Sequence, residues 1–246
     1  MLPLQNKLTL TVGIITHLLA PVYGFPSSVP RDLETRAVPL RIMPIGDSIT
    51  WGYELGQGTN GYRQQLLTDL VSAGYQVDFL GTQHSGTMVD NANEGYPGYR
   101  ISQIQAAIAP GLASCPNVAL VHAGTNDFTQ PDGTQGESWY QAPARLGNLM
   151  DSVLARCPRA VILVAKIIQR SDAQGQYLTN LYNDYMPNVV NDRVNRGYKV
   201  KIVDQSVIGE SELSDGIHPT PAGYDHMGHI WSAAVVSANN LGLITA

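Results

Sequence analysis

Five short, almost uninterrupted runs of apolar residues recur along the chain, separated by longer segments in which apolar residues follow helical spacing. Runs of this kind are typical of parallel strands that are covered on both faces of a sheet. The predicted strands are residues 40–46, 77–81, 118–124, 160–167 and 200–206, and the predicted helices are residues 62–73, 139–156, 177–196 and 221–239. This alternation predicts an α/β fold, a three-layer α/β/α sandwich around a central five-stranded parallel sheet with right-handed crossovers.

The N-terminus has a different pattern. Lys7 precedes the apolar run 8–20, and Val22 and Gly24 then occupy the positions that signal peptidase favours before a cleavage site. A buried helix is the alternative, but prolines flank the run and His17 interrupts it. We therefore expect residues 1–24 to be a signal peptide.

Residues 25–39 contain three prolines and two serines and have no hydrophobic period, which predicts a linker or a pro-segment. The catalytic domain is expected over residues 40–246. With a signal peptide at its start, the protein is expected to be secreted into the extracellular space.

Charge is sparse: 14% of the 246 residues are charged, the formal net charge is −5, and only four residues are lysine. A nucleic-acid partner is therefore excluded, because no basic patch is available to neutralise phosphates. No apolar run reaches the 18 or more residues of a membrane span, so no membrane partner is expected either. The length suits one sizeable domain, and we expect a monomer.

Cys115 and Cys157 are the two cysteines, and each is followed by proline and then by a predicted strand. If those strands are parallel neighbours in register, the two sulfur atoms lie side by side at the amino edge of the sheet. A disulfide is then expected in a secreted protein. The alternative is a pair of free buried thiols.

Three polar clusters carry candidate chemistry: GDSIT at 46–50, GTND at 124–127 and SDGIHP at 214–219. The first two follow predicted strands, and sites in α/β folds form outside the carboxyl ends of the strands. A serine hydroxyl needs a neighbouring base to become a nucleophile, and histidine has the pKa for that task near neutrality. These clusters predict acyl transfer with Ser48 as nucleophile, His218 as base and Asp215 as the residue that orients the histidine.

Acyl transfer also needs hydrogen-bond donors for the oxyanion that develops on the substrate carbonyl. The candidates are the Ser48 N–H group, the Asn126 side-chain amide and a glycine N–H group in the loop EGYPGYR at 94–100. Gly95 and Gly98 both fit, and Gly98 is preferred because an aromatic residue and an arginine follow it. The carboxylates beside these turns, Asp47 and Asp127, are expected to accept backbone N–H groups rather than to act in catalysis.

Together, GDSIT, EGYPGY, GTND and DGIHP resemble the four sequence blocks of the GDSL or SGNH hydrolases in order and spacing. The resemblance covers residues 40–246. The sequence that flanks the blocks is most similar to that of acetyl xylan esterases of carbohydrate esterase family 3. The resemblance implies a flavodoxin-like fold and a secreted serine esterase that removes acetyl groups from acetylated polysaccharide (xylan), or from a small ester, through an acyl-serine intermediate. No cofactor is expected. Some relatives bind structural calcium, but no acidic loop in this sequence fixes such a site, so no metal is expected. The site residues that the resemblance implies are a nucleophile, base and orienting acid at Ser48, His218 and Asp215, and an oxyanion hole at Ser48, Gly98 and Asn126.

Other readings stay open at this point. One is a GDSL lipase, lysophospholipase or other carboxylesterase that prefers longer acyl chains. Metal-dependent phosphoester hydrolysis would need several histidines near the blocks, where only His218 is available. A non-catalytic carbohydrate-binding module is a third reading.

His226 and His229 lie one turn apart on the last predicted helix, and packing is expected there rather than a metal site. Trp51 and Arg63 are expected to wall the pocket or to brace the first loop.

Overall fold

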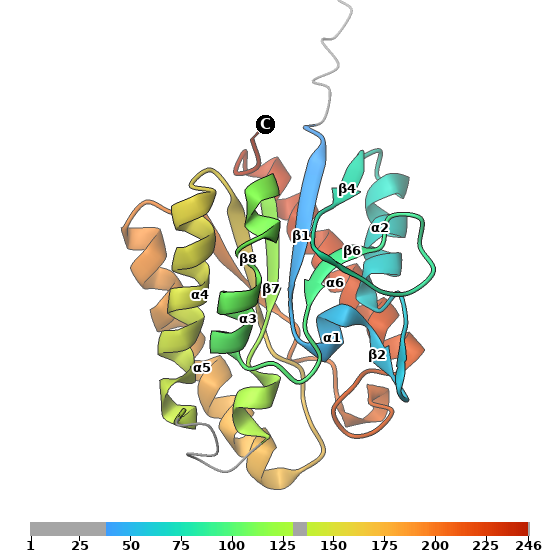
Figure 1. Ribbon diagram of the computed structural model, residues 1–246, viewed down its shortest axis with the longest axis vertical. Coiled ribbons are helices and arrows are strands. Elements are labelled where there is room, and N and C mark those ends of the chain that lie inside the picture. Colours follow the sequence, from blue (N-terminus) through green and yellow to red (C-terminus); the bar gives the residue numbers. More distant parts are fainter. Residues whose placement is uncertain (1–37, 130–136, 246) are drawn as a thin grey trace, which may run out of the picture. The chain divides into compact units, whose positions relative to one another are not determined.

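The structure is a computed structural model that describes residues 38–129 and 137–245. The predicted signal peptide and nearly all of the predicted linker lie outside the described residues. The five predicted strands are present and form a parallel sheet, which confirms the fold class (Figure 1). In spatial order they are β4 (Val77–Phe79), β1 (Leu40–Gly46), β7 (Val118–His122), β8 (Val161–Lys166) and β9 (Val200–Asp204).

The side of β1 that faces away from β7 is covered by two successive segments. β4 pairs with the first half of β1, and β6 (Ala92–Gly95) pairs with its last two residues. A short antiparallel strand, β5 (Gln83–His84), extends this edge, and β2 (Tyr53–Glu54) and β3 (Gln57–Gly58) form a separate hairpin. Sequence patterning missed β6 because its two central residues, Asn93 and Glu94, are polar yet fully buried.

Alternation along each strand divides the core into two layers. Met43 and Ile45 point to one face of the sheet, whereas Leu40 and Ile42 point to the other. The first face is covered by α3 (Ile101–Ala107), α4 (Ala142–Arg156) and α5 (Ala173–Asn195), and the second by α2 (Tyr62–Ser72) and α6 (Pro221–Asn240). Helix α3 was not predicted, although Ile101, Ile104 and Ile108 are spaced for a helical apolar face.

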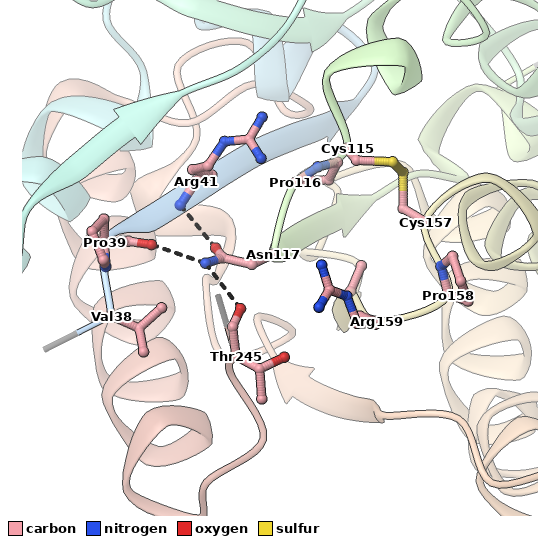
Figure 2. Close-up of a pocket in the computed structure, with 11 residues that line it drawn as sticks. Val38, Pro39, Arg41, Cys115, Pro116, Asn117, Cys157, Pro158, Arg159 and Thr245 are labelled. Carbon is pink, nitrogen blue, oxygen red and sulfur yellow. Dashed lines mark hydrogen bonds between the residues drawn. A yellow bond between two sulfur atoms is a disulfide. The ribbon is translucent and has the colours of Figure 1, made fainter.

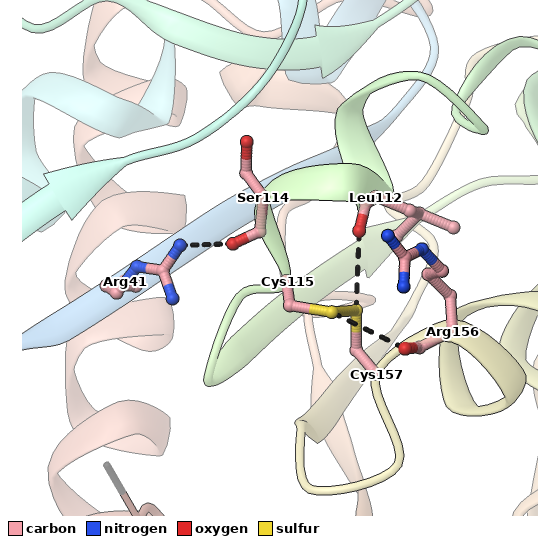
Figure 3. The surroundings of a disulfide bond; sticks show 6 residues. All are labelled: Arg41, Leu112, Ser114, Cys115, Arg156 and Cys157. Carbon is pink, nitrogen blue, oxygen red and sulfur yellow. Dashed lines mark hydrogen bonds between the residues drawn. A yellow bond between two sulfur atoms is a disulfide. The ribbon is translucent and has the colours of Figure 1, made fainter.

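The amino edge of the sheet is cross-linked. Cys115 and Cys157 form a disulfide with their Cα atoms 5.4 Å apart, as the register of β7 with β8 predicted (Figure 3). Beside it, the Arg41 guanidinium donates to the Ser114 carbonyl. The expectation of a bridge rather than two free thiols is therefore confirmed.

Asn117 ties three segments together at the same edge (Figure 2). Its Oδ1 accepts the Arg41 N–H group at 2.8 Å, and its Nδ2 donates to the Pro39 carbonyl at 2.9 Å and to the Thr245 carbonyl at 3.4 Å. These residues border a cavity of about 400 Å³ next to the disulfide. Within the described part of the chain, no helix has the length and apolar character that crossing a bilayer would require.

Candidate active site

The first cluster lies where β1 turns into the short helix α1 (Ser48–Trp51) at the carboxyl edge of the sheet (Figure 1). Gly46 has no room for a side chain, because an added Cβ would lie 2.2 Å from the His122 carbonyl oxygen on β7. Asp47 caps α1: its Oδ1 accepts the Ile49 N–H group at 3.0 Å. The strand and helix therefore hold Ser48 in a fixed, largely buried position.

Asp47 is fully buried, and burial raises its pKa to about 6 despite the hydrogen bond from Ile49. Its contacts agree with the expectation that it accepts a backbone N–H group.

His218 reaches Ser48 from the loop before α6. Its Nε2 lies 2.8 Å from Ser48 Oγ, and its Nδ1 lies 2.8 Å from Asp215 Oδ2. The structure thus brings together the three residues that the sequence proposed for the nucleophile, base and orienting acid. This series of hydrogen bonds matches what a serine nucleophile requires.

The loop around His218 is held at several points. Asp215 Oδ1 accepts the Ile217 and His218 N–H groups at 3.0 and 2.8 Å, and the Ser214 N–H group donates to the His218 carbonyl at 2.8 Å. Burial works against ionisation of Asp215, but the hydrogen bonds from His218 and Ile217 outweigh it and lower the pKa of Asp215. Asp215 is therefore ionised wherever the histidine can act as a base.

Tyr53 was missed by sequence reasoning. Its ring centroid lies 4.3 Å from that of His218, and its carbonyl accepts the Tyr224 hydroxyl at 2.7 Å. Tyr53 therefore packs the imidazole from the side of the β2–β3 hairpin. No signal in the sequence connects position 53 with position 218.

The two candidate glycines in the loop after β6 differ in their hydrogen bonding. The Gly95 N–H group donates to Asn93 Oδ1 at 2.8 Å, so it is already engaged inside the strand. Gly98 lies in the loop with a φ of +79°, a backbone conformation that favours glycine. Of the two, Gly98 is the better candidate oxyanion donor.

Asn126 lies in η2 (Thr125–Phe128), directly after β7. One N–H of its side-chain amide donates to the Tyr99 carbonyl at 2.9 Å, which draws η2 toward the Gly98 loop. Since an amide carries two N–H donors, this contact uses only one of them. The structure places Asn126 and the Gly98 loop at the same sheet edge as Ser48, because β1, β6 and β7 are hydrogen-bonded neighbours.

Arg63 is buried and braces the first loop, which was one of its two expected roles. Its guanidinium donates to the carbonyl oxygens of Asn91 at 2.8 Å, Ser85 at 3.1 Å and Trp51 at 3.2 Å. Arg63 therefore connects the end of α1 to the segment between β4 and β6.

Three other described histidines, His122, His226 and His229, have their own surroundings outside the site. His122 is fully buried on β7, and burial lowers its pKa to about 4, so it is neutral near pH 7. His226 pairs with Glu212 at 2.9 Å and His229 with Asp69 at 2.7 Å. Within residues 38–129 and 137–245, no group of three or more His, Cys, Asp or Glu side chains is arranged to hold a metal ion.

A parallel α/β sheet that carries serine, histidine and aspartate hydrogen-bonded in series at its carboxyl edge has the side-chain arrangement of a serine hydrolase. The chain belongs to the GDSL-like lipase/acylhydrolase family, whose model matches residues 45–226.

Several named proteins are similar to this chain. A family 3 carbohydrate esterase of Clostridium thermocellum has a solved structure that is 27% identical, with a TM-score of 0.68 over 82% of this chain and 98% of that one. A multidomain esterase of Ruminococcus flavefaciens is 26% identical over 92% of this chain and 32% of its own length. An acetylxylan esterase of Xylanibacter ruminicola is 24% identical over 89% and 47%. The chain thus spans about a third to a half of the curated relatives that it matches.

Proposed function

We propose that the protein is a secreted serine esterase that removes acetyl groups from acetylated polysaccharide, with xylan as the substrate class. The observation that carries the proposal is the series of two 2.8 Å contacts from Ser48 through His218 to Asp215. The names of the relatives support the substrate class, since they include a family 3 carbohydrate esterase and an acetylxylan esterase.

In the proposed reaction, His218 Nε2 takes the proton from Ser48 Oγ as the oxygen attacks the ester carbonyl. The Ser48 and Gly98 N–H groups and the Asn126 amide donate to the oxyanion. The bond between the acyl carbon and the sugar oxygen then breaks, His218 gives the proton to the leaving sugar oxygen, and the acetyl group stays on Ser48 as an ester. Water then attacks the acetyl carbon as His218 takes one of its protons. The bond from that carbon to Ser48 Oγ breaks, acetate leaves, and His218 returns the proton to Oγ. Asp215 holds the Nδ1–H of the ring and stabilises the imidazolium in both steps.

Charge agrees with a neutral substrate. Residues 41–246 carry 12 basic and 18 acidic side chains, a net charge of −6, which offers no attraction to an anionic lipid surface. The disulfide between Cys115 and Cys157 supports the proposal of secretion, because such bonds persist in oxidising compartments.

The substrate class is tested by comparing acetate release from acetylated xylan with hydrolysis of 4-nitrophenyl acetate, butyrate and octanoate. The proposal expects acetate release from the polysaccharide and the highest kcat/KM on the acetyl ester among the three. Ser48→Ala is the control and should abolish all four activities. A clear preference for octanoate would instead assign a lipase or lysophospholipase.

A further inference from the structure

A buried ion pair lies directly behind the proposed oxyanion donors. Arg145, on the second turn of α4, donates to Asp127 Oδ1 from Nη2 at 2.6 Å and from Nε at 3.0 Å. The Asp127 side chain is fully buried and that of Arg145 is 11% exposed. Arg145 also donates to the Ser138 carbonyl at 3.0 Å and lies 3.6 Å from Glu137. The pair therefore anchors η2 to α4.

The second oxygen of Asp127 reaches the other arm of the site. Asp127 Oδ2 accepts the N–H group of Ile101, the first residue of α3, at 3.1 Å. Ile101 lies three residues after Gly98, and the neighbouring Asn126 donates to Tyr99 at 2.9 Å. Asn126 and Asp127, two consecutive residues of η2, thus both hold the loop that carries Gly98. We call these two contacts the clamp.

The clamp requires Asp127 to be ionised or at least to keep both oxygen atoms as acceptors. Burial raises the pKa of Asp127, and the hydrogen bonds and charge of Arg145 oppose that rise. Removal of one partner of a buried ion pair leaves the other uncompensated, so the carboxyl would take up a proton or turn away from its place. Either change loosens its hold on Ile101.

We propose that Arg145 is a positioning residue for the reaction: through Asp127 it fixes the distance between the Asn126 amide and the Gly98 N–H group, so that both donors meet the same oxyanion. This inference rests on the proposed function. The sequence expected Asp127 only to accept a backbone N–H group, and the structure adds Arg145 as the group that holds it. Misplacement of such donors by about 1 Å can cost on the order of 10²-fold in rate.

The test is a double-mutant cycle on 4-nitrophenyl acetate with Arg145→Met, Asn126→Ala and the variant that carries both. Arg145→Met is expected to lower kcat by about 10²-fold with KM within about threefold, because a transition-state interaction is lost. Asn126→Ala alone should cost on the order of 10²- to 10³-fold. If Arg145 acts through the oxyanion donors, the double variant should lose no more than about threefold beyond Asn126→Ala.

A matched control comes from a second ion pair that involves α4. Arg193 on α5 pairs with Asp151 on α4 at 2.7 Å, and its side chain is 10% exposed, almost the same as that of Arg145. Arg193→Met should also lower the thermal unfolding midpoint, although less than Arg145→Met, because Asp151 is 35% exposed and keeps Arg196 at 3.3 Å. It should leave kcat within about twofold, because no contact of this pair reaches η2 or the Gly98 loop. Arg145→Lys keeps the positive charge but lacks the guanidinium that donates two hydrogen bonds to Asp127, so it should recover part of kcat. This variant replaces Arg145→Met in the double-mutant cycle if Arg145→Met does not fold.

The proposal is overturned if the two losses multiply in the double variant, if Arg145→Met keeps the wild-type kcat, or if Arg193→Met loses kcat equally. Failure of the proposed function has a different signature. In that case Ser48→Ala keeps the esterase activity, whatever the cycle gives.

Discussion

The two edges of one sheet are built in opposite ways. At the carboxyl edge, β1 and β7 end in polar clusters. Ser48 Oγ, after β1, lies 2.8 Å from Nε2 of His218, which comes from the loop before α6. At the amino edge, the same strands begin beside a disulfide and beside Asn117, which joins three segments. The carboxyl edge gathers the candidate reacting groups, and the amino edge is joined by cross-links.

The difference between the two edges indicates that cross-links stabilise the sheet at its amino edge, away from the candidate site at its carboxyl edge. In the proposed reaction a hydroxyl, an imidazole and three N–H donors must keep hydrogen-bonding capacity for a substrate, so the carboxyl edge cannot be fully satisfied by its own contacts. A cross-link at the far edge restrains the same strands without using any of those groups. The two edges should therefore respond independently to substitution.

The largest expected change in the free energy of unfolding comes from the amino edge. Replacement of both Cys115 and Cys157 by alanine opens a closed loop with a sequence separation of 42. The chain-entropy model predicts a loss of about 4 kcal/mol in the free energy of unfolding, measured by urea or guanidinium titration. At a temperature where the variant is folded, kcat on 4-nitrophenyl acetate should stay within about twofold. A large loss of kcat in the folded variant would show that the edges are coupled.

A smaller effect is expected at the carboxyl edge, from Asp47→Asn. The pKa of Asp47 is raised from 3.8 to about 6 by burial, so the native state holds its proton more tightly than the unfolded chain does. Stability therefore falls as pH rises from about 4 to about 6, by about 3 kcal/mol for this group. Asparagine keeps the acceptor for the Ile49 N–H group and has no charge to bury.

The measurement is denaturant unfolding of both proteins at pH 4 and pH 8. The stability of Asp47→Asn relative to the wild type should increase between these two pH values. A difference that is the same at pH 4 and pH 8 would contradict the burial of an ionisable Asp47.

Much of this arrangement could be predicted from the sequence because it depends on local patterns. Continuous apolar runs predicted the five parallel strands, and the short clusters around Ser48 and His218 predicted which side chains meet. Strand β6 escaped prediction because Asn93 and Glu94 are buried with hydrogen-bond partners, which an apolar pattern cannot register. The apolar spacing that begins at Ile101 would have predicted α3.

The contacts that position the site could not be predicted in the same way. Arg145 reaches Asp127 across 18 residues, and Tyr53 packs on His218 from a hairpin far away in the chain. Such pairs depend on how helices and loops pack against the sheet, and no local spacing encodes that packing. Sequence reasoning therefore predicted which candidate reacting groups meet, and it missed Arg145 and Tyr53, which pack beside them.

The central claim is that Ser48 is the nucleophile, and covalent labelling tests it most directly. The wild-type protein is incubated with a fluorophosphonate, and the modified peptide is identified by mass spectrometry, with Ser48→Ala treated in parallel. The account predicts one adduct per chain, on Ser48, with loss of esterase activity in proportion to labelling and no adduct on Ser48→Ala. An adduct on another serine, or esterase activity that survives in Ser48→Ala, would contradict it.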